Sequence, residues 1–353
     1  MKIVRLSIVG FGTVGQGLAV LLTRKEHLLK QEYGLDVRLV SAANARHGFI
    51  YRDEGLDIPT LLELVARRRP LTEYPAAYHW NNALEGLKTT GGDVLAEATG
   101  TNLRDAEPGI SHIRAALTEG MHVITANKGP AALYAQELFA LAREHGVQLR
   151  LESTVMAGTP VINTLREGMA GARVQAIRAI LNGTTNYILS AMTAGHDYAD
   201  VLAEAQAQGY AEADPTADVE GYDTVAKTLI LATLAFGRSL RPEQVIRRGI
   251  TTITKEQMQQ AKEQGKRIKL VATLRLPQEP SSEASTQAAP LEVRVEPTAL
   301  PESDPLARVD GVLNAITIQT DTLPEVTIIG PGAGRIQTGQ GLLTDLIAVA
   351  NTK

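Results

Sequence analysis

The stretch KIVRLSIVGFGTVGQGLAVLLT, residues 2–23, decides the fold of this chain. Its first part is short and rich in β-branched residues, which predicts a buried parallel strand, and its last part has the apolar spacing of a helix. Between them lies the pattern G-x-G-x-x-G. The order of strand, glycine loop and helix is the context in which this pattern binds a dinucleotide. We therefore predict that the chain opens with a nucleotide-binding unit.

Each glycine of the pattern has a physical task. Gly10 permits the tight turn after the strand, Gly12 lets the backbone approach a pyrophosphate, and Gly15 allows the helix to pack closely on the strand. The N-terminus of that helix offers amide hydrogens and the positive end of its dipole to the phosphates. The predicted cofactor loop consists of these glycines and the residues between them, Phe11, Thr13 and Val14.

Length and composition limit the class of protein. With 353 residues the chain fits two domains, or one elaborate domain. Its 44% apolar and 21% charged residues are ordinary for a soluble globular protein, and its net charge of −4 argues against a general nucleic-acid binder. Without cysteine the chain has no disulfide framework, thiolate zinc site or cysteine nucleophile. Because this fits a reducing compartment, we predict a cytoplasmic protein.

Several other classes are excluded by pattern. The N-terminal stretch resembles a signal peptide in its early basic residues, but glycines interrupt its apolar run and no small-residue cleavage pattern follows. No other stretch approaches the length of a membrane span. The histidines lack metal-ligand spacing, and no G-x-S-x-G motif is present. We therefore expect no membrane partner, no zinc or iron site and no serine hydrolase.

Predicted strands and helices alternate along the chain after the glycine loop and its helix. The sequence predicts strands over 93–100, 121–129 and 147–153 and helices over 106–120 and 130–146. This alternation predicts an α/β protein with a Rossmann-type, doubly wound parallel sheet, whose ligands lie beyond the carboxyl ends of its strands. Thr99, Gly100 and Lys128 are at such ends. A lysine there belongs either to the surface or to the site, and its position above the glycine loop keeps both interpretations open for Lys128.

The choice of cofactor depends on the end of the second strand, 36–44. An NAD-specific site usually has Asp or Glu there, which binds the ribose 2′-hydroxyl. This chain has Asn44 at that place and Arg46 two residues later. A neutral side chain beside a guanidinium tolerates a 2′-phosphate, which favours NADP. The alternative is that Arg46 lies in solvent and takes no part in binding.

The second half begins with a turn-rich segment, 153–168. The stretch ARVQAIRAILNGTTNYILSAM, residues 172–192, then predicts a strand, an Asn-Gly turn and a helix. An amphipathic helix follows over 198–209. β-Strands are expected over 266–276, 291–297 and 311–320, and the polar segment Gln278–Pro290 is predicted to be a flexible hairpin tip or insertion.

The stretch GYAEADPTADVEGYDTVAK, residues 209–227, contains five carboxylates. Pro215 prevents a continuous helix through it, so Glu212 and Asp214 are expected on a loop. Asp218 is placed to cap the next helix. The apolar stripe expected on that helix is formed by Val219, Tyr222, Ala226, Leu229 and Ile230.

Asp223 and Lys227 are four residues apart, so they share one face of that helix. One interpretation is a solvated salt bridge. The other is a functional pair, because the helix becomes fully apolar after Lys227 and the preceding loop brings carboxylates to the same end. A partly buried lysine beside carboxylates suits general acid–base work.

The stretch 325–350 predicts a last strand, a glycine turn and a last helix. The turn is either only a tight turn or a place where the backbone approaches the cofactor as the chain returns to the first domain. We predict a dinucleotide-binding domain over 1–150, completed by 330–353, and an α+β domain for substrate binding and dimerisation over 151–329.

These motifs together resemble homoserine dehydrogenase over essentially the whole chain outside Gln278–Pro290. The resemblance is carried, in chain order, by GFGTVGQG, TANKGP, VMAGTPVI, ILNGTTNYIL, GYAEADPTADVEGYDTVAK and GPGAG. It implies the NAD(P)-linked interconversion of L-homoserine and L-aspartate 4-semialdehyde, a step of the aspartate pathway toward threonine, isoleucine and methionine. It also implies a homodimer.

The resemblance assigns roles to residues of the acidic stretch. Lys227 is implied as the acid–base residue and Asp223 as the residue that orients substrate or water. Glu212 is implied to bind the substrate amino group, with the Gly209 and Tyr210 backbone beside it. Asp218 is included among the expected substrate-binding residues.

The resemblance also assigns roles near the cofactor. Lys128 is implied between nicotinamide and substrate, which makes it the alternative proton carrier, and Gly334 is implied to approach the cofactor. A loop with Glu152, Val155, Ala157 and Thr159 matches one that holds a monovalent cation, Na⁺ or K⁺, in some members.

Some features depart from the family pattern. Ala217 replaces a carboxylate found in some members, and we expect no regulatory ACT domain, which makes threonine feedback doubtful. Two rivals remain: another amino-acid dehydrogenase of this layout, and a non-catalytic NAD(P)-binding sensor. A sensor needs the glycine loop but not Glu212, Asp223 and Lys227 together.

Overall fold

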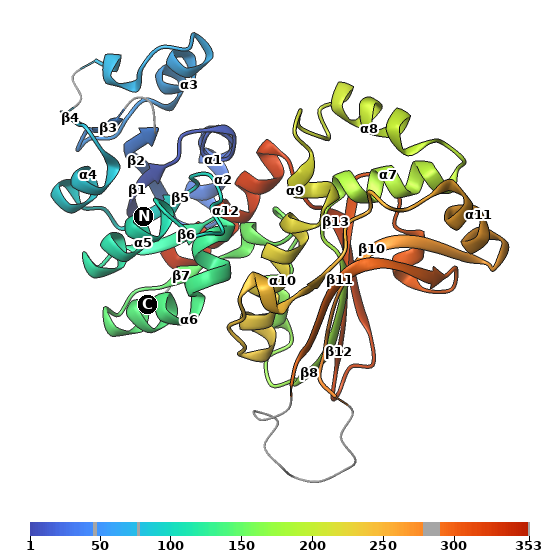
Figure 1. Cartoon of the computed structure of the whole chain (residues 1–353). Coiled ribbons are helices and arrows are strands. Elements are labelled where there is room, and N and C mark those ends of the chain that lie inside the picture. Colours follow the sequence, from blue (N-terminus) through green and yellow to red (C-terminus); the bar gives the residue numbers. More distant parts are fainter. Residues whose placement is uncertain (45–47, 76–77, 278–289, 352–353) are drawn as a thin grey trace. The chain divides into compact units, whose positions relative to one another are not determined.

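The computed structural model describes residues 1–44, 48–75, 78–277 and 290–351 (Figure 1). The chain divides into two compact units. Unit 1 consists of Met1–Pro160 and Ala333–Lys353, and unit 2 consists of Val161–Gly332. In the described ranges no helix combines the length and the apolar character that a membrane crossing needs.

Unit 1 is built on a seven-stranded sheet of order β4-β3-β2-β1-β5-β6-β7. The five strands from β2 to β7 in this order pair in parallel, so the predicted Rossmann-type sheet is confirmed. The strands are β1 (Lys2–Val9), β2 (Leu35–Asn44), β3 (Gly48–Tyr51), β4 (Tyr78–Trp80), β5 (Val94–Glu97), β6 (His122–Thr125) and β7 (Leu149–Arg150).

Two strands at one edge of this sheet were not expected from the sequence. β3 and β4 pair antiparallel with their neighbours and extend the parallel sheet beyond β2. Both are short, and Trp80 stacks edge-on against Phe49 across the pair, at 5.8 Å between ring centroids. Strands of three and four residues are too short for alternation to be recognised in the sequence.

Helices cover the sheet of unit 1 and include the last helix of the chain. The helix predicted after the glycine loop is divided at Lys25 into two. The helices are α1 (Thr13–Arg24), α2 (Glu26–Gln31), α3 (Ile58–Ala66), α4 (Ala83–Thr90), α5 (Gly109–Thr118), α6 (Lys128–Glu144) and α12 (Arg335–Ala350).

The last helix packs on the first through glycines. A Cβ atom at Gly17 of α1 would lie 2.0 Å from the carbonyl oxygen of Arg335, and one at Gly339 of α12 would lie 2.6 Å from the carbonyl carbon of Gly17. Since no side chain fits there, the backbones of α1 and α12 approach each other directly. This crossing holds α12 against α1, the helix that follows the glycine loop.

Unit 2 is built on a mixed sheet of order β13-β12-β8-β10-β11-β9. β10 pairs antiparallel with both β11 and β8, and β8 pairs antiparallel with β12. The strands are β8 (Val174–Ile180), β9 (Ile246–Arg247), β10 (Lys266–Arg275), β11 (Glu292–Pro301), β12 (Leu313–Thr320) and β13 (Val326–Pro331). The expected flexibility of Gln278–Pro290 concerns a segment of which 278–289 lies outside the described residues.

The helices of unit 2 are α7 (Gly183–Thr193), α8 (Tyr198–Ala207), α9 (Thr216–Val219), α10 (Tyr222–Phe236) and α11 (Lys255–Glu263). α7, α10 and α11 all contact β10 (Figure 1). α10 is buried from Thr224 to Thr233, because most of its side chains are apolar.

Three local predictions in this unit were wrong. Asn182 and Gly183 do not form a turn; the Asn182 side chain caps α7 by accepting from the backbone N–H of Thr185 at 2.9 Å. Asp218 caps no helix, since it lies inside α9 and Gly221, with a φ of 83°, is the N-cap of α10. Tyr222 is not part of the apolar stripe, because its ring is 45% exposed beneath the guanidinium of Arg247.

Candidate active site

The glycine loop of unit 1 needs glycine for two different reasons. Gly10 has a φ of 96°, and a Cβ there would lie 2.3 Å from the carbonyl carbon of Ala98 at the end of β5. A Cβ at Gly15 would lie 2.5 Å from the carbonyl oxygen of Gly10. A Cβ at Gly12, in contrast, would meet no atom of the described chain within 4 Å. The protein itself therefore does not require glycine at this position, whereas the close approach of a ligand to the backbone would.

The start of α1 is open to a ligand. Gly12 is its N-cap, and no side chain of the described residues caps it. Amide hydrogens of the first turn then remain for phosphate oxygens. Of the other loop residues, Phe11 is fully buried, Thr13 is exposed and Val14 packs against the core.

Of the two residues expected to decide between NAD and NADP, the structure describes only Asn44. Asn44 is the last residue of β2, where its backbone pairs with Gly48, and its side chain is half-buried. Arg46 lies outside the described residues. The structure thus has a neutral side chain at the strand end where an NAD-specific site usually has a carboxylate.

A buried carboxylate that the sequence analysis missed lies at the end of β5. Glu97 is 0% exposed, and one of its oxygens accepts a hydrogen bond from the hydroxyl of Thr99 and, at 3.2 Å, from its backbone N–H. The Nδ1 atom of His112, on α5, lies 3.6 Å from the same oxygen. A glutamate inside an apolar strand that ends at a predicted ligand edge was the available signal.

The Glu97 network joins the ends of two strands. The Thr99 hydroxyl accepts from Nδ2 of Asn127 at 3.0 Å, and the Asn127 Oδ1 accepts from the N–H of Gly129 at 3.0 Å. Asn127 is thereby the N-cap of α6, whose first residue is the half-buried Lys128. One hydrogen-bonded network thus connects the loop of Thr99 with the start of α6, where Lys128 lies, while Gly100 is exposed.

The segment after β7 packs tightly against α12. Glu152, Val155, Ala157 and Thr159 are all buried, and the backbone N–H of Glu152 donates to Asp345 at 2.8 Å. Ala157 has a φ of 52°, which is unusual for a residue with a side chain. In the described chain no group of three or more His, Asp or Glu side chains could hold a metal ion.

Gly334 begins the turn into α12. Its φ of 128° favours glycine, and a Cβ there would lie 2.2 Å from Oε1 of Gln337. The tight turn alone therefore accounts for this glycine. A contact with the cofactor is a separate matter that stays a prediction.

The predicted pair in unit 2 is buried. Lys227 Nζ lies 2.8 Å from Asp223 Oδ2, with side-chain exposures of 8% and 16%. The same Nζ donates to the carbonyl oxygen of Leu181 at 2.6 Å. The interpretation as a solvated salt bridge was therefore wrong, because the pair is held at the end of β8 and shielded from water.

Asn182 connects this pair to a third acidic residue. Its Nδ2 donates to Asp218 Oδ1 at 2.7 Å and to Asp223 Oδ2 at 3.1 Å. The sequence analysis treated Asn182 only as a turn residue. A polar residue that directly follows a buried strand and precedes a helix was the signal for it.

The pKa of the Asp218 carboxyl is shifted by its surroundings. Burial, and then the negative charge of Asp223, raise the pKa of the Asp218 carboxyl above its usual range. Hydrogen bonds from Asn182 and Thr184 act in the opposite direction. The Thr184 hydroxyl lies 3.0 Å from Asp218 Oδ2 and 2.7 Å from the carbonyl oxygen of Tyr210.

The loop from Gly209 to Pro215 presents a carboxylate to solvent. Gly209 has a φ of 74° just after α8, and Tyr210 is 43% exposed. Glu212 is exposed, and no described residue forms a hydrogen bond or ion pair with its carboxylate, although its carbonyl accepts from Gln206 at 3.1 Å. The structure thus brings Asp218, Asp223 and Lys227 together and leaves Glu212 available.

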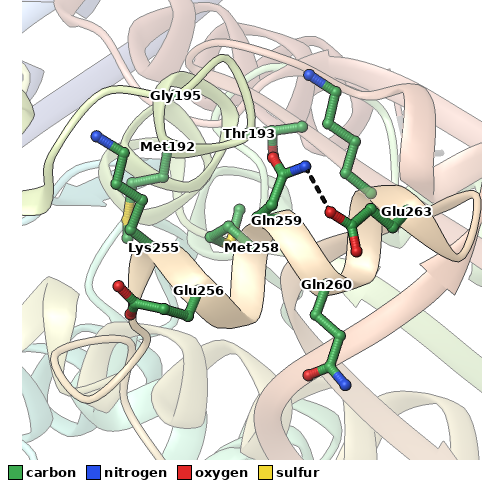
Figure 2. Close-up of a pocket in the computed structure, with 10 residues that line it drawn as sticks. Met192, Thr193, Gly195, Lys255, Glu256, Met258, Gln259, Gln260 and Glu263 are labelled. Carbon is green, nitrogen blue, oxygen red and sulfur yellow. Dashed lines mark hydrogen bonds between the residues drawn. The ribbon is translucent and has the colours of Figure 1, made fainter.

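A cavity elsewhere in unit 2 contains none of these residues. It measures about 410 Å³ and lies between the end of α7 and α11 (Figure 2). Its rim is polar, with a hydrogen bond of 2.9 Å between Gln259 and Glu263, and its floor contains Met192 and Met258. Lysines and glutamates of α11 both line this cavity.

The comparisons with known proteins agree over both units. Residues 10–152 match the family model for the NAD-binding domain of homoserine dehydrogenase, and residues 160–347 match the model for homoserine dehydrogenase. A curated NAD(+)-dependent homoserine dehydrogenase of Pseudomonas canavaninivorans is 38% identical over 98% of this chain and 96% of its own length. The homoserine dehydrogenase of Methanocaldococcus jannaschii is 37% identical over 98% of both chains.

Solved structures are similar over the full chain as well. A hyperthermophilic archaeal homoserine dehydrogenase in complex with NADPH has a TM-score of 0.81 and 31% identity, with 99% of this chain and 98% of that chain covered. A homoserine dehydrogenase from Thiobacillus denitrificans has a TM-score of 0.81 and 35% identity, with 99% and 74% covered. The chain therefore belongs to the homoserine dehydrogenase family of NAD(P)-dependent oxidoreductases.

Proposed function

We propose that this enzyme interconverts L-homoserine and L-aspartate 4-semialdehyde with Lys227 as the proton carrier and Glu212 as the ligand of the substrate amino group. The glycine loop belongs to unit 1, and Lys227 and Glu212 belong to unit 2. The bound nicotinamide provides the chemistry of hydride transfer to or from the carbon that bears the oxygen. The residues of this chain must bind the substrate and move the proton.

The observation that carries the proposal is the hydrogen bonding of Lys227. A lysine ammonium has three donors, and the described residues accept from only two directions, at Asp223 and the Leu181 carbonyl. The third direction remains for a substrate oxygen. In the oxidative direction the neutral amine takes the hydroxyl proton, and in the reductive direction the ammonium gives it back. Such help is typically worth ~10²–10⁴ in rate.

Glu212 supports the binding of a substrate that carries an ammonium group. Its carboxylate is exposed and unpaired within the described chain, unlike those of Asp218 and Asp223. An opposite charge on the ligand would provide the partner that the protein does not. Asp223 orients the substrate or water while it holds Lys227.

We propose NADP as the preferred cofactor. The support is the neutral Asn44 at the end of β2, where an NAD-specific site has a carboxylate. Relatives are divided, since the Pseudomonas protein is named as NAD(+)-dependent and the archaeal structure contains NADPH. A second proposal concerns the loop Glu152–Thr159, where burial and the φ of Ala157 support a monovalent cation, Na⁺ or K⁺, on backbone carbonyls.

We also propose that the enzyme is a homodimer. The sheet of unit 2 supports this, because Leu313 on β12 and Ile329 on its edge strand β13 are 40% and 52% exposed. Light scattering on the purified enzyme at several concentrations tests this proposal directly.

The experiment for the function follows reduced-nicotinamide absorbance with L-homoserine at alkaline pH, with NADP⁺ and NAD⁺ in parallel. We expect turnover with both and a higher kcat/KM for NADP⁺. Glu212→Gln should raise KM for homoserine about 10- to 100-fold, which corresponds to about 1.5–3 kcal/mol for a hydrogen bond to a charged group. Asp214→Asn removes a carboxylate from the same loop and serves as the matched control. Equal KM values for these two variants would contradict the role of Glu212.

A further inference from the structure

We infer that Asn182 is a positioning residue of this active site: its carboxamide holds Asp218 and Asp223 side by side and thereby fixes the amine of Lys227. The inference rests on the proposed function, because Asn182 matters for catalysis only if Lys227 carries the proton. It concerns a residue at the carboxyl end of β8 that contacts no reacting atom in the proposed mechanism.

The carboxamide of Asn182 is fully used. Its side chain is buried, and its two amide hydrogens are directed to Asp218 Oδ1 at 2.7 Å and Asp223 Oδ2 at 3.1 Å. Its oxygen accepts from the backbone N–H of Thr185 at 2.9 Å. The reversed orientation of the amide would direct an oxygen at two carboxylates and a nitrogen at a backbone donor. The chemistry of the partners therefore fixes the orientation.

The two carboxylates need such a bridge. Both have an oxygen within hydrogen-bond distance of one nitrogen atom, so they lie close together in a partly buried place where like charges repel. The raised pKa of Asp218, caused by burial and then by the charge of Asp223, is consistent with this. A neutral group with two donors relieves the repulsion without adding a charge.

The bridge extends to Lys227 through one atom. Asp223 Oδ2 accepts from Asn182 Nδ2 and also lies 2.8 Å from Lys227 Nζ. Leu181, the residue before Asn182, accepts from the same Nζ through its carbonyl. Two consecutive residues after β8 thus hold the amine, one directly and one through Asp223. A shift of Asn182 would move the proton carrier relative to the substrate.

A purely structural role for Asn182 is the competing explanation, because it also caps α7. Two substitutions separate the roles. Asp and Ser are as good as Asn at an N-cap, so Asn182→Asp and Asn182→Ser both keep the cap. Asn182→Asp replaces the double donor by a third carboxylate, and Asn182→Ser leaves one short donor that cannot serve both acids.

The test measures kcat, KM for L-homoserine and the dissociation constant of NADP⁺ for the wild-type enzyme and both variants. We expect Asn182→Ser to lower kcat about 10- to 100-fold, the scale of a misplacement of about 1 Å, and Asn182→Asp to lower it further. The NADP⁺ dissociation constant should stay within about twofold, because Asn182 belongs to unit 2 and the glycine loop to unit 1. A urea unfolding transition like that of the wild type shows that each variant is folded.

The outcomes separate the inference from the proposed function. A wild-type enzyme without turnover of L-homoserine would overturn both. An active wild type with kcat of Asn182→Ser and Asn182→Asp within twofold of it would overturn the inference alone, because the cap is then the whole role. If Asn182→Asp does not fold, Asn182→Ser decides the question, since it adds no charge.

Discussion

Two carboxyl groups, Glu97 in unit 1 and Asp218 in unit 2, are removed from water in different ways. Glu97 is fully buried and accepts from Thr99, with His112 nearby. Asp218 is partly buried and faces Asp223 across the Asn182 amide. Burial without a full counter-charge is costly, so such groups are kept where they position others.

The stability cost of Asp218 predicts a pH dependence. Because folding raises the pKa of Asp218, its contribution is most favourable below the ordinary aspartate pKa and is lost as pH rises through the raised value. Asp218→Asn does not titrate. Urea unfolding should therefore show that Asp218→Asn is more stable, relative to the wild type, at pH 8 than at pH 4.

Asp214 provides a control of opposite sign for this prediction. Hydrogen bonds from the side chain and backbone of Thr216 lower the pKa of Asp214. Its contribution is present above the ordinary aspartate pKa and lost as pH falls through the lowered value. Asp214→Asn should therefore be less stable relative to the wild type at pH 8 than at a pH below that lowered value. The same trend for both variants would show that the account of Asp218 is wrong.

Glu97 yields a second prediction at the residue scale. Glu97→Ala leaves the half-buried donors of Thr99 without their acceptor and should lower the unfolding free energy by about 1–3 kcal/mol. Glu97→Gln keeps an acceptor oxygen and should cost less. Urea unfolding of the two variants checks this, and equal losses would mean that the charge of Glu97 matters rather than its hydrogen bonds.

At the scale of elements, the crossing of α1 and α12 depends on glycine. Gly17→Ala would place a Cβ 2.0 Å from the carbonyl oxygen of Arg335, and such overpacking costs about 1–3 kcal/mol. Ordinarily alanine in a helix is better than glycine by about 1 kcal/mol. Chemical denaturation should show the loss for Gly17→Ala, with Gly168→Ala as the control, where the nearest atom is at 3.6 Å. Similar stabilities would contradict the close crossing.

The sequence predicts elements well where one pattern decides them. The strand, glycine loop and helix of residues 2–23 were predictable because turn chemistry and hydrophobic spacing agree there. The division of α9 from α10 at Gly221 was not, since a helical stripe continues through it. Tyr222 was misplaced for a related reason: the guanidinium of Arg247 lies 3.9 Å from its ring centroid, a contact with a residue 25 positions away.

In the candidate site, too, local contacts were predictable and long-range contacts were not. The spacing of Asp223 and Lys227 was enough to predict the pair, because four residues make one helical turn. The position of Asn182 after a buried strand was a signal, but its partner was not predictable, because Asp218 is 36 residues away and only the folded chain joins them. The local sequence pattern identifies which residues can do chemistry, whereas long-range packing decides which of them come together in one site.

At the scale of the whole molecule, binding of the dinucleotide should stabilise the folded enzyme. A ligand at 100 times its dissociation constant adds about 2.7 kcal/mol to the unfolding free energy. Because Asn44 is neutral, we expect NADP⁺ to raise the melting temperature more than NAD⁺ at equal concentration. Thermal unfolding of the full chain measures this without any turnover, and a larger shift with NAD⁺ would refute the proposed preference.

The most direct test of the account is the turnover of L-homoserine by Lys227→Ala and Lys128→Ala beside the wild type, followed by reduced-nicotinamide absorbance across alkaline pH. With Lys227 as the proton carrier, Lys227→Ala should lose about 10²–10⁴ in kcat. Lys128→Ala should keep more of the activity. Near-normal turnover of Lys227→Ala, together with loss in Lys128→Ala, would contradict the account and assign the proton to Lys128.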